Sequence, residues 1–178
     1  MAHSEDTDEG FVPLDVGKAG ASASIDVHVS PEGLGQHEPR FVLLMIKPPK
    51  GGWNTSNDAY NISLYRKADD LMESLTGFRP IFSPPFDNQQ PAPHKGVKLH
   101  IVWTEKKSGK VLQDNIVTAD TYRGSESGRI KVGFGYSLVL NGIQYAPGDY
   151  IATVTAVDND PRFDGTFRTG IISGYTWK

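Results

Sequence analysis

The chain has 178 residues, a net charge of −3 and no cysteine. This length suits one domain, and the lack of cysteine excludes disulfides, thiolate metal ligands and cysteine nucleophiles. A negative net charge without any Lys/Arg-rich run argues against nucleic acid as a partner. No apolar run approaches the roughly 20 residues that cross a bilayer, so we predict no transmembrane segment.

The first part of the chain predicts a leader followed by strands. Residues 1–10 are polar and acidic without periodicity, which is typical of a flexible leader, and we assign residues 11–178 to a single β-sandwich domain. A short strand is expected at Phe11–Val16. Ser24–Ser30 alternates apolar and polar residues, as a half-buried strand does. Arg40–Lys47 is almost continuously apolar, which predicts a central strand covered on both faces.

Residues 51–93 interrupt this strand pattern and form a predicted insertion. Apolar residues recur at helical spacing over residues 64–75, which predicts one short helix with Asp69 and Asp70 near its start. Gly77 is expected to cap the end of this helix. The proline-rich stretch that follows resists regular structure, so we predict a long connection from one sheet to the other.

The second half of the chain alternates apolar and polar residues in several further runs. Ser108-Gly109 predicts a turn that joins the first two runs into a hairpin, and Asn141-Gly142 predicts another tight turn. Gly135 is expected to mark a bulge or a close backbone approach. The runs cover residues 97–104, 111–118, 129–140, 149–158 and 166–175. The total of about eight strands is usual for a sandwich, so the predicted fold class is an all-β sandwich with one short helix in an insertion.

A set of apolar strand residues is expected to share one core between the sheets. Trp103 lies on a regular strand, so we expect it to belong to the core rather than to a binding surface. The other members of the predicted core are Phe41, Leu43, Met45, Leu99, Ile101, Val132, Phe134, Ile151 and Val154.

The second half also resembles a known group of domains. Pro147-Gly148-Asp149-Tyr150 resembles the Pro-Gly-x-Tyr entry to a late strand in bacterial immunoglobulin-like domains, and residues 97–178 resemble the end of small exported bacterial domains, often lipoproteins. The resemblance implies an immunoglobulin-like β-sandwich, a periplasmic or otherwise exported location, and a precursor that can carry a lipid anchor. It also implies a buried Tyr150 whose hydroxyl bonds nearby backbone, as in a tyrosine corner.

Histidines and acidic residues do not form a recognisable metal site. His28 and His100 lie on the polar faces of separate predicted strands, where two solvated histidines explain the pattern better than a shared metal. Asp158, Asp160 and Asp164 could offer oxygen ligands to calcium, but acidic residues between strands are more often turn formers that bond local backbone. We therefore predict no metal.

Signatures of nucleophilic catalysis and nucleotide binding are also missing. Ser137 lies within a predicted strand and lacks the second glycine of a nucleophile elbow, so we expect an exposed strand serine. Gly133-Phe134-Gly135 lacks the third glycine and the following helix that a phosphate-binding loop needs. We predict no catalytic residue and no cofactor, and the chain is expected not to be an enzyme.

The insertion holds the best candidates for a partner-binding surface. Trp53, Tyr60, Tyr65, Phe82 and Phe86 offer large, rigid rings near a glycine-rich loop, a combination that suits molecular recognition. The alternative explanation is that these rings only seal an open end of the sandwich, because large rings bury readily.

Three functions remain open from the sequence. The leading hypothesis is a non-catalytic periplasmic binding module for a protein partner, in its most specific form an immunity protein that inhibits a secreted toxin. A carbohydrate-recognition module is the alternative, based on the rings of Trp53, Tyr60 and Tyr65. An enzyme of unrecognised type comes third, since acidic residues such as Asp69 and Glu73 could converge with distant residues in the fold.

Overall fold

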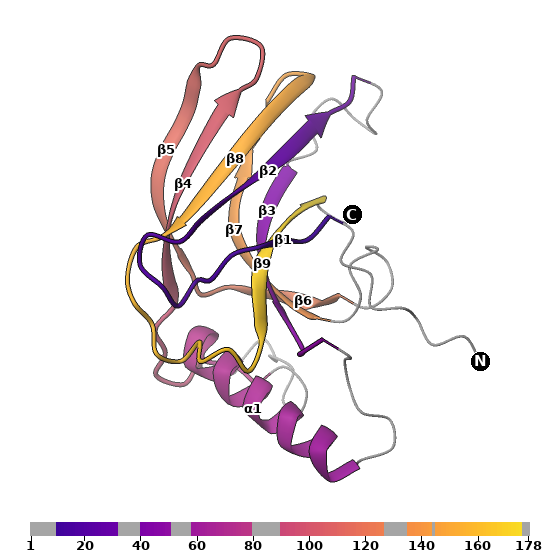
Figure 1. Ribbon diagram of the computed structural model, residues 1–178, viewed down its shortest axis with the longest axis vertical. Coiled ribbons are helices and arrows are strands. Elements are labelled where there is room, and N and C mark those ends of the chain that lie inside the picture. Colours follow the sequence, from indigo (N-terminus) through magenta and orange to yellow (C-terminus); the bar gives the residue numbers. More distant parts are fainter. Residues whose placement is uncertain are drawn as a thin grey trace, which may run out of the picture.

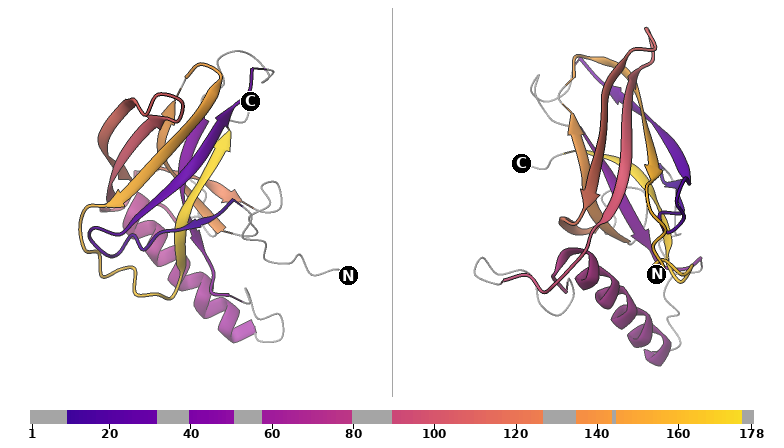
Figure 2. Two further views of the ribbon diagram at one scale, coloured as in Figure 1. Left: turned by 45° about the horizontal axis from the view of Figure 1, so that its top comes forward. Right: turned by 90° about the vertical axis from the view of Figure 1, so that its left-hand side faces the viewer.

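The fold is an all-β sandwich with one helix, as the sequence predicts. Two antiparallel sheets pack face to face, and the helix lies across one end of them (Figures 1 and 2). No helix in the described part of the chain has the length and apolar character that crossing a membrane requires. The computed structural model describes residues 10–31, 40–50, 58–79, 90–126, 135–143 and 145–175.

The first sheet has five strands in the order β1-β9-β3-β7-β6. β3 pairs with β9 on one side and β7 on the other, which confirms the prediction of a central strand. The sequence does not predict β6, because its residues lack an apolar alternation and form a strand through pairing with β7. The bounds are Val12–Pro13 for β1, Arg40–Lys47 for β3, Tyr122–Glu126 for β6, Gly135–Ile143 for β7 and Arg168–Tyr175 for β9.

The second sheet has four strands in the order β2-β8-β4-β5. β4 and β5 form the predicted hairpin, whose turn contains Gly109 at a φ of 69°. The inner face of this sheet follows the predicted alternation, with Leu99, Ile101 and Trp103 of β4 fully buried. The bounds are Ser22–Val29 for β2, Val97–Glu105 for β4, Val111–Ala119 for β5 and Gly148–Ala156 for β8.

Helix α1 spans Asp58–Thr76 and connects β3 of the first sheet to β4 of the second. At 19 residues it is longer than predicted, and Asp69 and Asp70 lie in its second half rather than near its start. The reason is that the helix begins at Asp58, whereas the apolar periodicity that predicts it begins only at Leu64. Gly77 ends the helix as predicted: its φ is 81°, and its amide donates to the carbonyl oxygen of Glu73 at 2.8 Å.

The central strand β3 is buried on both faces, and this divides the predicted core. Leu44 joins the main core between the sheets, whereas Leu43 and Met45 lie on the other face of the five-stranded sheet and pack with Ile172. The prediction that Leu43 and Met45 share one core with Leu99 is therefore wrong. A strand whose two faces are both covered carries no alternation that indicates which side chains point inward.

The remaining members of the predicted core are partly confirmed. Leu99, Ile101 and Val154 are fully buried in the main core, as predicted. Ile151 is partly exposed, because it lies three residues from Val154 and so points to the opposite face of β8. The side chain of Phe41 and the residues Val132 and Phe134 lie outside the described part of the structure.

Strand β7 runs further than its sequence suggests. Asn141 and Gly142 pair with Val42 and Phe41 of β3, so they lie within the strand and do not form the predicted tight turn. An Asn-Gly turn joins two strands that pair with each other, but β7 connects to β8 of the other sheet. The register of β7 against β3 shifts beside Val42, which marks a bulge.

The predictions for two residues of β7, Gly135 and Ser137, have opposite outcomes. Gly135 marks a close approach, as predicted: a Cβ there would lie 2.7 Å from the Met45 Cε atom and 3.0 Å from the Ile46 carbonyl oxygen. Ser137 is fully buried rather than exposed. Its burial follows from the same cause as that of Met45, because both faces of the five-stranded sheet are covered near the centre.

Tyr150 is buried as predicted, with 4% of its surface exposed, and its hydroxyl donates to the carbonyl oxygen of Ala146. Burial raises the pKa of this phenol. The Tyr150 ring lies 5.2 Å from the ring of Tyr145, and Tyr145 in turn meets Trp103 edge-on at 6.3 Å. The turn before β8 is therefore held by an aromatic cluster at the end of the sandwich away from α1 (Figure 1).

Candidate functional site

The candidate site lies at the end of the sandwich that α1 covers (Figures 1 and 2). One aliphatic face of the helix joins the same apolar core as the two sheets, and its members are at most 8% exposed. Burying such a face is what holds an amphipathic helix on a β-sandwich. The members in the main core are Ala68, Leu71, Met72 and Leu75, and Phe163 and Phe167 pack against the same core. Leu64 is buried on the same helix with 5% of its surface exposed.

A hollow of about 280 Å³ lies against the first half of α1, and we call it the Tyr60 hollow. Tyr60 lines it and keeps 41% of its surface exposed. Its other walls come from distant parts of the chain, with Pro49 following β3 and Gly165 and Thr166 preceding β9. The helix also contributes Ser63, Leu64 and Lys67.

Charged groups of both signs lie at the edge of the Tyr60 hollow. Asp164 accepts a hydrogen bond from the Thr166 amide at 2.9 Å. Hydrogen bonds from the side chain and backbone of Thr166, together with the positive charge of Lys67, lower the pKa of the Asp164 carboxyl. This carboxylate is therefore ionised at neutral pH. The lining combines an aromatic ring with the cation Lys67, and the anion Asp164 precedes the lining residues Gly165 and Thr166 in the chain. Such a set is suitable for binding a polar surface.

The structure places two of the five aromatic residues proposed as a binding surface. Tyr60 lines the hollow, whereas Tyr65 is half-buried and does not line it. Five helical residues rotate the direction of a side chain by about 140°, so the two rings cannot form one platform. Trp53, Phe82 and Phe86 lie outside the described residues.

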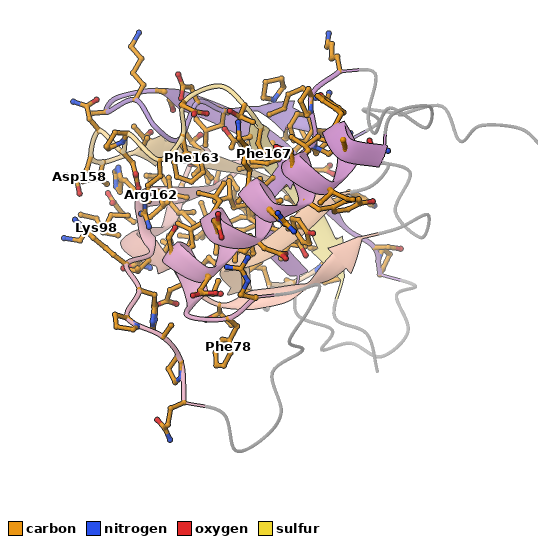
Figure 3. All side chains as sticks on the ribbon, turned by 90° about the horizontal axis from the view of Figure 1, so that it is seen from below. Phe78, Lys98, Asp158, Arg162, Phe163 and Phe167 are labelled. Atoms are coloured by element: carbon orange, nitrogen blue, oxygen red, sulfur yellow. The ribbon has the colours of Figure 1, made fainter. Side chains whose placement is uncertain are left out.

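A second hollow, of about 350 Å³, lies beside the C-terminal end of α1. Figure 3 shows Lys98, Asp158 and Arg162 gathered there, next to the end of the helix. Phe163 and Phe167, on the same connection between β8 and β9, are partly buried and pack against the main core. The lining is Lys95–Lys98 and Asp158–Arg162, and we call this the Arg162 hollow.

Arg162 ties three segments of the chain together at this place. Its Nε atom donates to Asp160 Oδ1 at 2.9 Å, and one terminal nitrogen donates to the carbonyl oxygens of Ser74 at 3.0 Å and Lys95 at 2.7 Å. The guanidinium therefore joins the end of α1, the segment before β4 and the connection before β9. The hydrogen bonds and charge of Arg162 lower the pKa of the Asp160 carboxyl.

This arrangement gives Arg162 and Asp160 a structural role, because their donors and acceptors are already engaged with the protein. Lys95, Lys98 and Asp158 leave charges of both signs around the hollow, so the site has no strong preference for an anion or a cation. The sequence did not predict the Arg162 contacts. Asp160 and Arg162 carry opposite charges on either side of Pro161, which indicates a local ion pair. The bond from Arg162 to Ser74 on α1 joins residues that are far apart in sequence.

The two strand histidines each pair with a carboxylate. His28 Nδ1 lies 2.7 Å from Asp149, and His100 Nε2 lies 2.5 Å from Asp114. On the intervening strand β8, His28 is opposite Asp149 and His100 is opposite Thr155, which are separated by about 20 Å at the usual rise of a strand. They cannot share a metal. Within the described ranges, no three His, Asp or Glu side chains are grouped as metal ligands would be.

Comparisons with known proteins support the fold alone. No protein-family model matches this chain, and no curated protein matches it in sequence. A crystal structure of a protein from Sulfurospirillum deleyianum superposes with a TM-score of 0.56 at 14% sequence identity, covering 94% of this chain and 96% of the other. The two chains thus share an architecture along nearly their whole length.

Proposed function

We propose that this chain is a non-catalytic binding module that recognises a protein partner with the helix-capped end of its sandwich. The observation that carries the proposal is the position of Tyr60. Its ring stays 41% exposed over a hollow, while the aliphatic face of the same helix is buried in the main core. An exposed ring beside a hollow is a common feature of surfaces that recognise a partner.

The Tyr60 hollow has room for a small part of a partner. Its volume of about 280 Å³ lies near the lower end of the range of roughly 300–1,000 Å³ that is typical of small-molecule pockets. It can take one or two side chains of a partner, while Tyr60 and the exposed Ser63, which both line it, contact the surface around them. Lys67 and Asp164 would fix the orientation of the partner through polar contacts.

A carbohydrate-recognition module is less well supported. Sugar rings stack on flat aromatic platforms, and Tyr60 and Tyr65 point in directions about 140° apart on the helix. A glycan array is the direct test of this alternative. Specific glycan binding that Tyr60→Ala abolishes would favour carbohydrate over protein.

The exported location and the immunity-type role belong to the same proposal. They rest on the resemblance of residues 97–178 to small exported bacterial domains, and the immunoglobulin-like character is inferred on the same ground. An immunity protein acts by covering the working surface of a toxin. An exposed ring on a rigid helix, with charges beside it, is the kind of surface that such a role needs.

The first step of the test is to capture the partner in the producing bacterium. A photo-crosslinking residue at position 63 lines the Tyr60 hollow, and one at Lys107 lies in the β4–β5 turn at the far end of the sandwich. We expect a specific adduct at position 63 alone. Equal adducts at both positions would contradict the proposed surface.

The second step uses the purified partner and matched variants. Tyr60→Ala should weaken binding by about tenfold to thirtyfold, or roughly 1.4–2 kcal/mol, whereas Tyr60→Phe should bind nearly as well because it keeps the ring. Lys67→Glu should weaken binding and slow association, and Lys107→Glu should leave binding unchanged. Isothermal titration calorimetry and surface plasmon resonance measure these differences.

Unfolding experiments separate a binding ring from a sealing ring. Tyr60→Ala should change the free energy of unfolding by less than about 1 kcal/mol, while Leu75→Ala on the sealing face should cost about 2–5 kcal/mol. If Tyr60→Ala is as destabilising as Leu75→Ala and leaves partner binding intact, Tyr60 is part of the seal and the proposal fails.

A further inference from the structure

Strand β5 is an edge of the four-stranded sheet. It pairs with β4 along one side, and no described strand pairs with its other side (Figure 1). Its nine residues include Val111 and Ile116, which are 53% and 64% exposed. A long edge strand with exposed apolar side chains is a template for pairing with another strand.

The edge strands β1 and β2 each carry protection against such pairing. β1 has two residues, one of which is Pro13. β2 lies close to β9 and carries Asp26, which forms an ion pair with Lys106 at 2.9 Å. β5 also lies close to the other sheet, at β7, and its Asp114 pairs with His100, but its residues include no proline, lysine or arginine. An exposed edge without these residues offers its unpaired backbone groups to the edge of another chain.

We propose that two copies of this chain join edge to edge through β5, in antiparallel register, about a two-fold axis at Ile116. The two four-stranded sheets then form one continuous sheet across the dimer. Ile116 of one copy packs against Ile116 of the second copy, and Thr118 lies opposite Asp114 of the second copy. This interface goes beyond the partner-binding surface at the helix-capped end and does not depend on it.

Electrostatics disfavours three registers close to this one, those with axes at Asp114, Asn115 and Val117. In a two-fold antiparallel pair, side chains that face each other across the two strands lie on the same face of the sheet, so the axis must pass through a residue of β5. Each choice of that residue defines one register. An axis at Asp114 places two carboxylates opposite each other, and an axis at Val117 places Asp114 opposite Asp120 of the second copy. An axis at Asn115 puts Ile116 beside a carboxylate. Like charges directly opposite are destabilising, and the Ile116 register avoids them.

The Ile116 register also provides charge complementarity. Lys98 of β4 pairs with Thr118 of β5 in the same row of the outer face. In the dimer this row continues to Asp114 of the second copy, two strand spacings or about 10 Å from the Lys98 backbone, and that carboxylate also lies 2.5 Å from His100 of its own copy. Lys98 is exposed and has no ion-pair partner among the described residues, so its long side chain can extend along the row toward that carboxylate. The symmetric contact forms in the other half.

Sedimentation equilibrium over a range of protein concentrations tests the dimer. We expect the wild-type chain to dimerise reversibly, Ile116→Lys to weaken the dimer by at least about tenfold, and Ile62→Lys to leave it unchanged. Ile62 is a matched control because it is an exposed apolar residue on α1, away from the edge strand. A wild-type chain that stays monomeric up to its solubility limit overturns the proposal, as does a dimer that Ile116→Lys does not weaken.

Single cysteines test the register, since the natural chain has none. Ile116→Cys should give a covalent dimer with a short bismaleimide crosslinker, and Asp114→Cys alone should not, because its two copies lie far apart along the strands. The double variant Asp114→Cys/Thr118→Cys should crosslink, because those positions face each other. Crosslinking of Asp114→Cys in preference to Ile116→Cys would overturn the proposed register. Circular dichroism confirms that each variant is folded before it is scored.

Discussion

Replacing Arg162 with methionine should destabilise the protein, because this side chain joins three segments at the end of α1. Methionine keeps much of the length of the side chain and removes its donors. The change abolishes the bonds from the guanidinium to Asp160, Ser74 and Lys95. A hydrogen bond to a charged group contributes about 1.5–3 kcal/mol and a neutral one about 1 kcal/mol, but contacts that share one side chain are not additive.

The partial exposure of the pair sets the expected magnitude. Side-chain exposure is 25% for Arg162 and 15% for Asp160, so water screens the lost charge only in part. Breaking a fully buried pair costs about 3–5 kcal/mol and an exposed pair less than about 1 kcal/mol. We therefore expect Arg162→Met to lower the free energy of unfolding by about 2–3 kcal/mol in urea denaturation at pH 7.

The pH dependence of this loss follows from Asp160. Arg162 lowers the pKa of the Asp160 carboxyl in the folded state, so the pair stabilises the protein at pH values above the ordinary aspartate pKa of about 3.9. This stabilisation disappears as the pH falls through the lower folded-state pKa. The difference between wild type and Arg162→Met should therefore be full near pH 7 and should shrink below about pH 4.

A matched control is Arg66→Met, which removes an exposed arginine on α1 and should change stability by less than about 0.5 kcal/mol. A double-mutant cycle with Asp160→Asn isolates the pair from the other contacts. The reasoning is refuted if Arg162→Met costs no more than Arg66→Met, or if its cost is the same at pH 3 as at pH 7.

Two further changes test the turns that frame the sandwich. Tyr150→Phe should lower the free energy of unfolding by about 1 kcal/mol, because it removes one hydroxyl bond to Ala146 and keeps the buried ring; no loss in urea denaturation would show that this bond contributes nothing. Gly77→Ala should cost at least about 1 kcal/mol, since the position has a φ of 81° and a Cβ would lie 2.6 Å from the Pro91 Cβ and 2.8 Å from the Ala92 carbonyl oxygen. Gly109→Ala is its control, because that site has a similar φ with nothing within 4 Å of the added atom, and equal thermal stability of the two variants would contradict the role of the clash.

The sequence by itself determined the features that repeat with a local period. Alternation in β4 and β8 identified buried residues such as Leu99 and Val154, because each strand has one solvated face. The spacing of apolar residues identified α1, and the Pro-Gly-x-Tyr segment identified a buried Tyr150. Of the candidate site, the sequence indicated Tyr60, because its aromatic side chain and its place in the insertion can be read from the sequence directly.

Tertiary structure alone decided the features that depend on pairing between distant segments. Local period cannot show which side of β3 faces the core, because both sides are covered, so Leu43 was assigned to the wrong face and Ser137 was expected to be exposed. The Tyr60 hollow needs Pro49, α1 and Gly165 to meet, and Arg162 needs the end of α1 beside the connection before β9. No spacing of residues in the sequence indicates these long-range contacts. They arise because burying the aliphatic face of α1 against both sheets fixes where the helix lies, and the surface groups follow from that position.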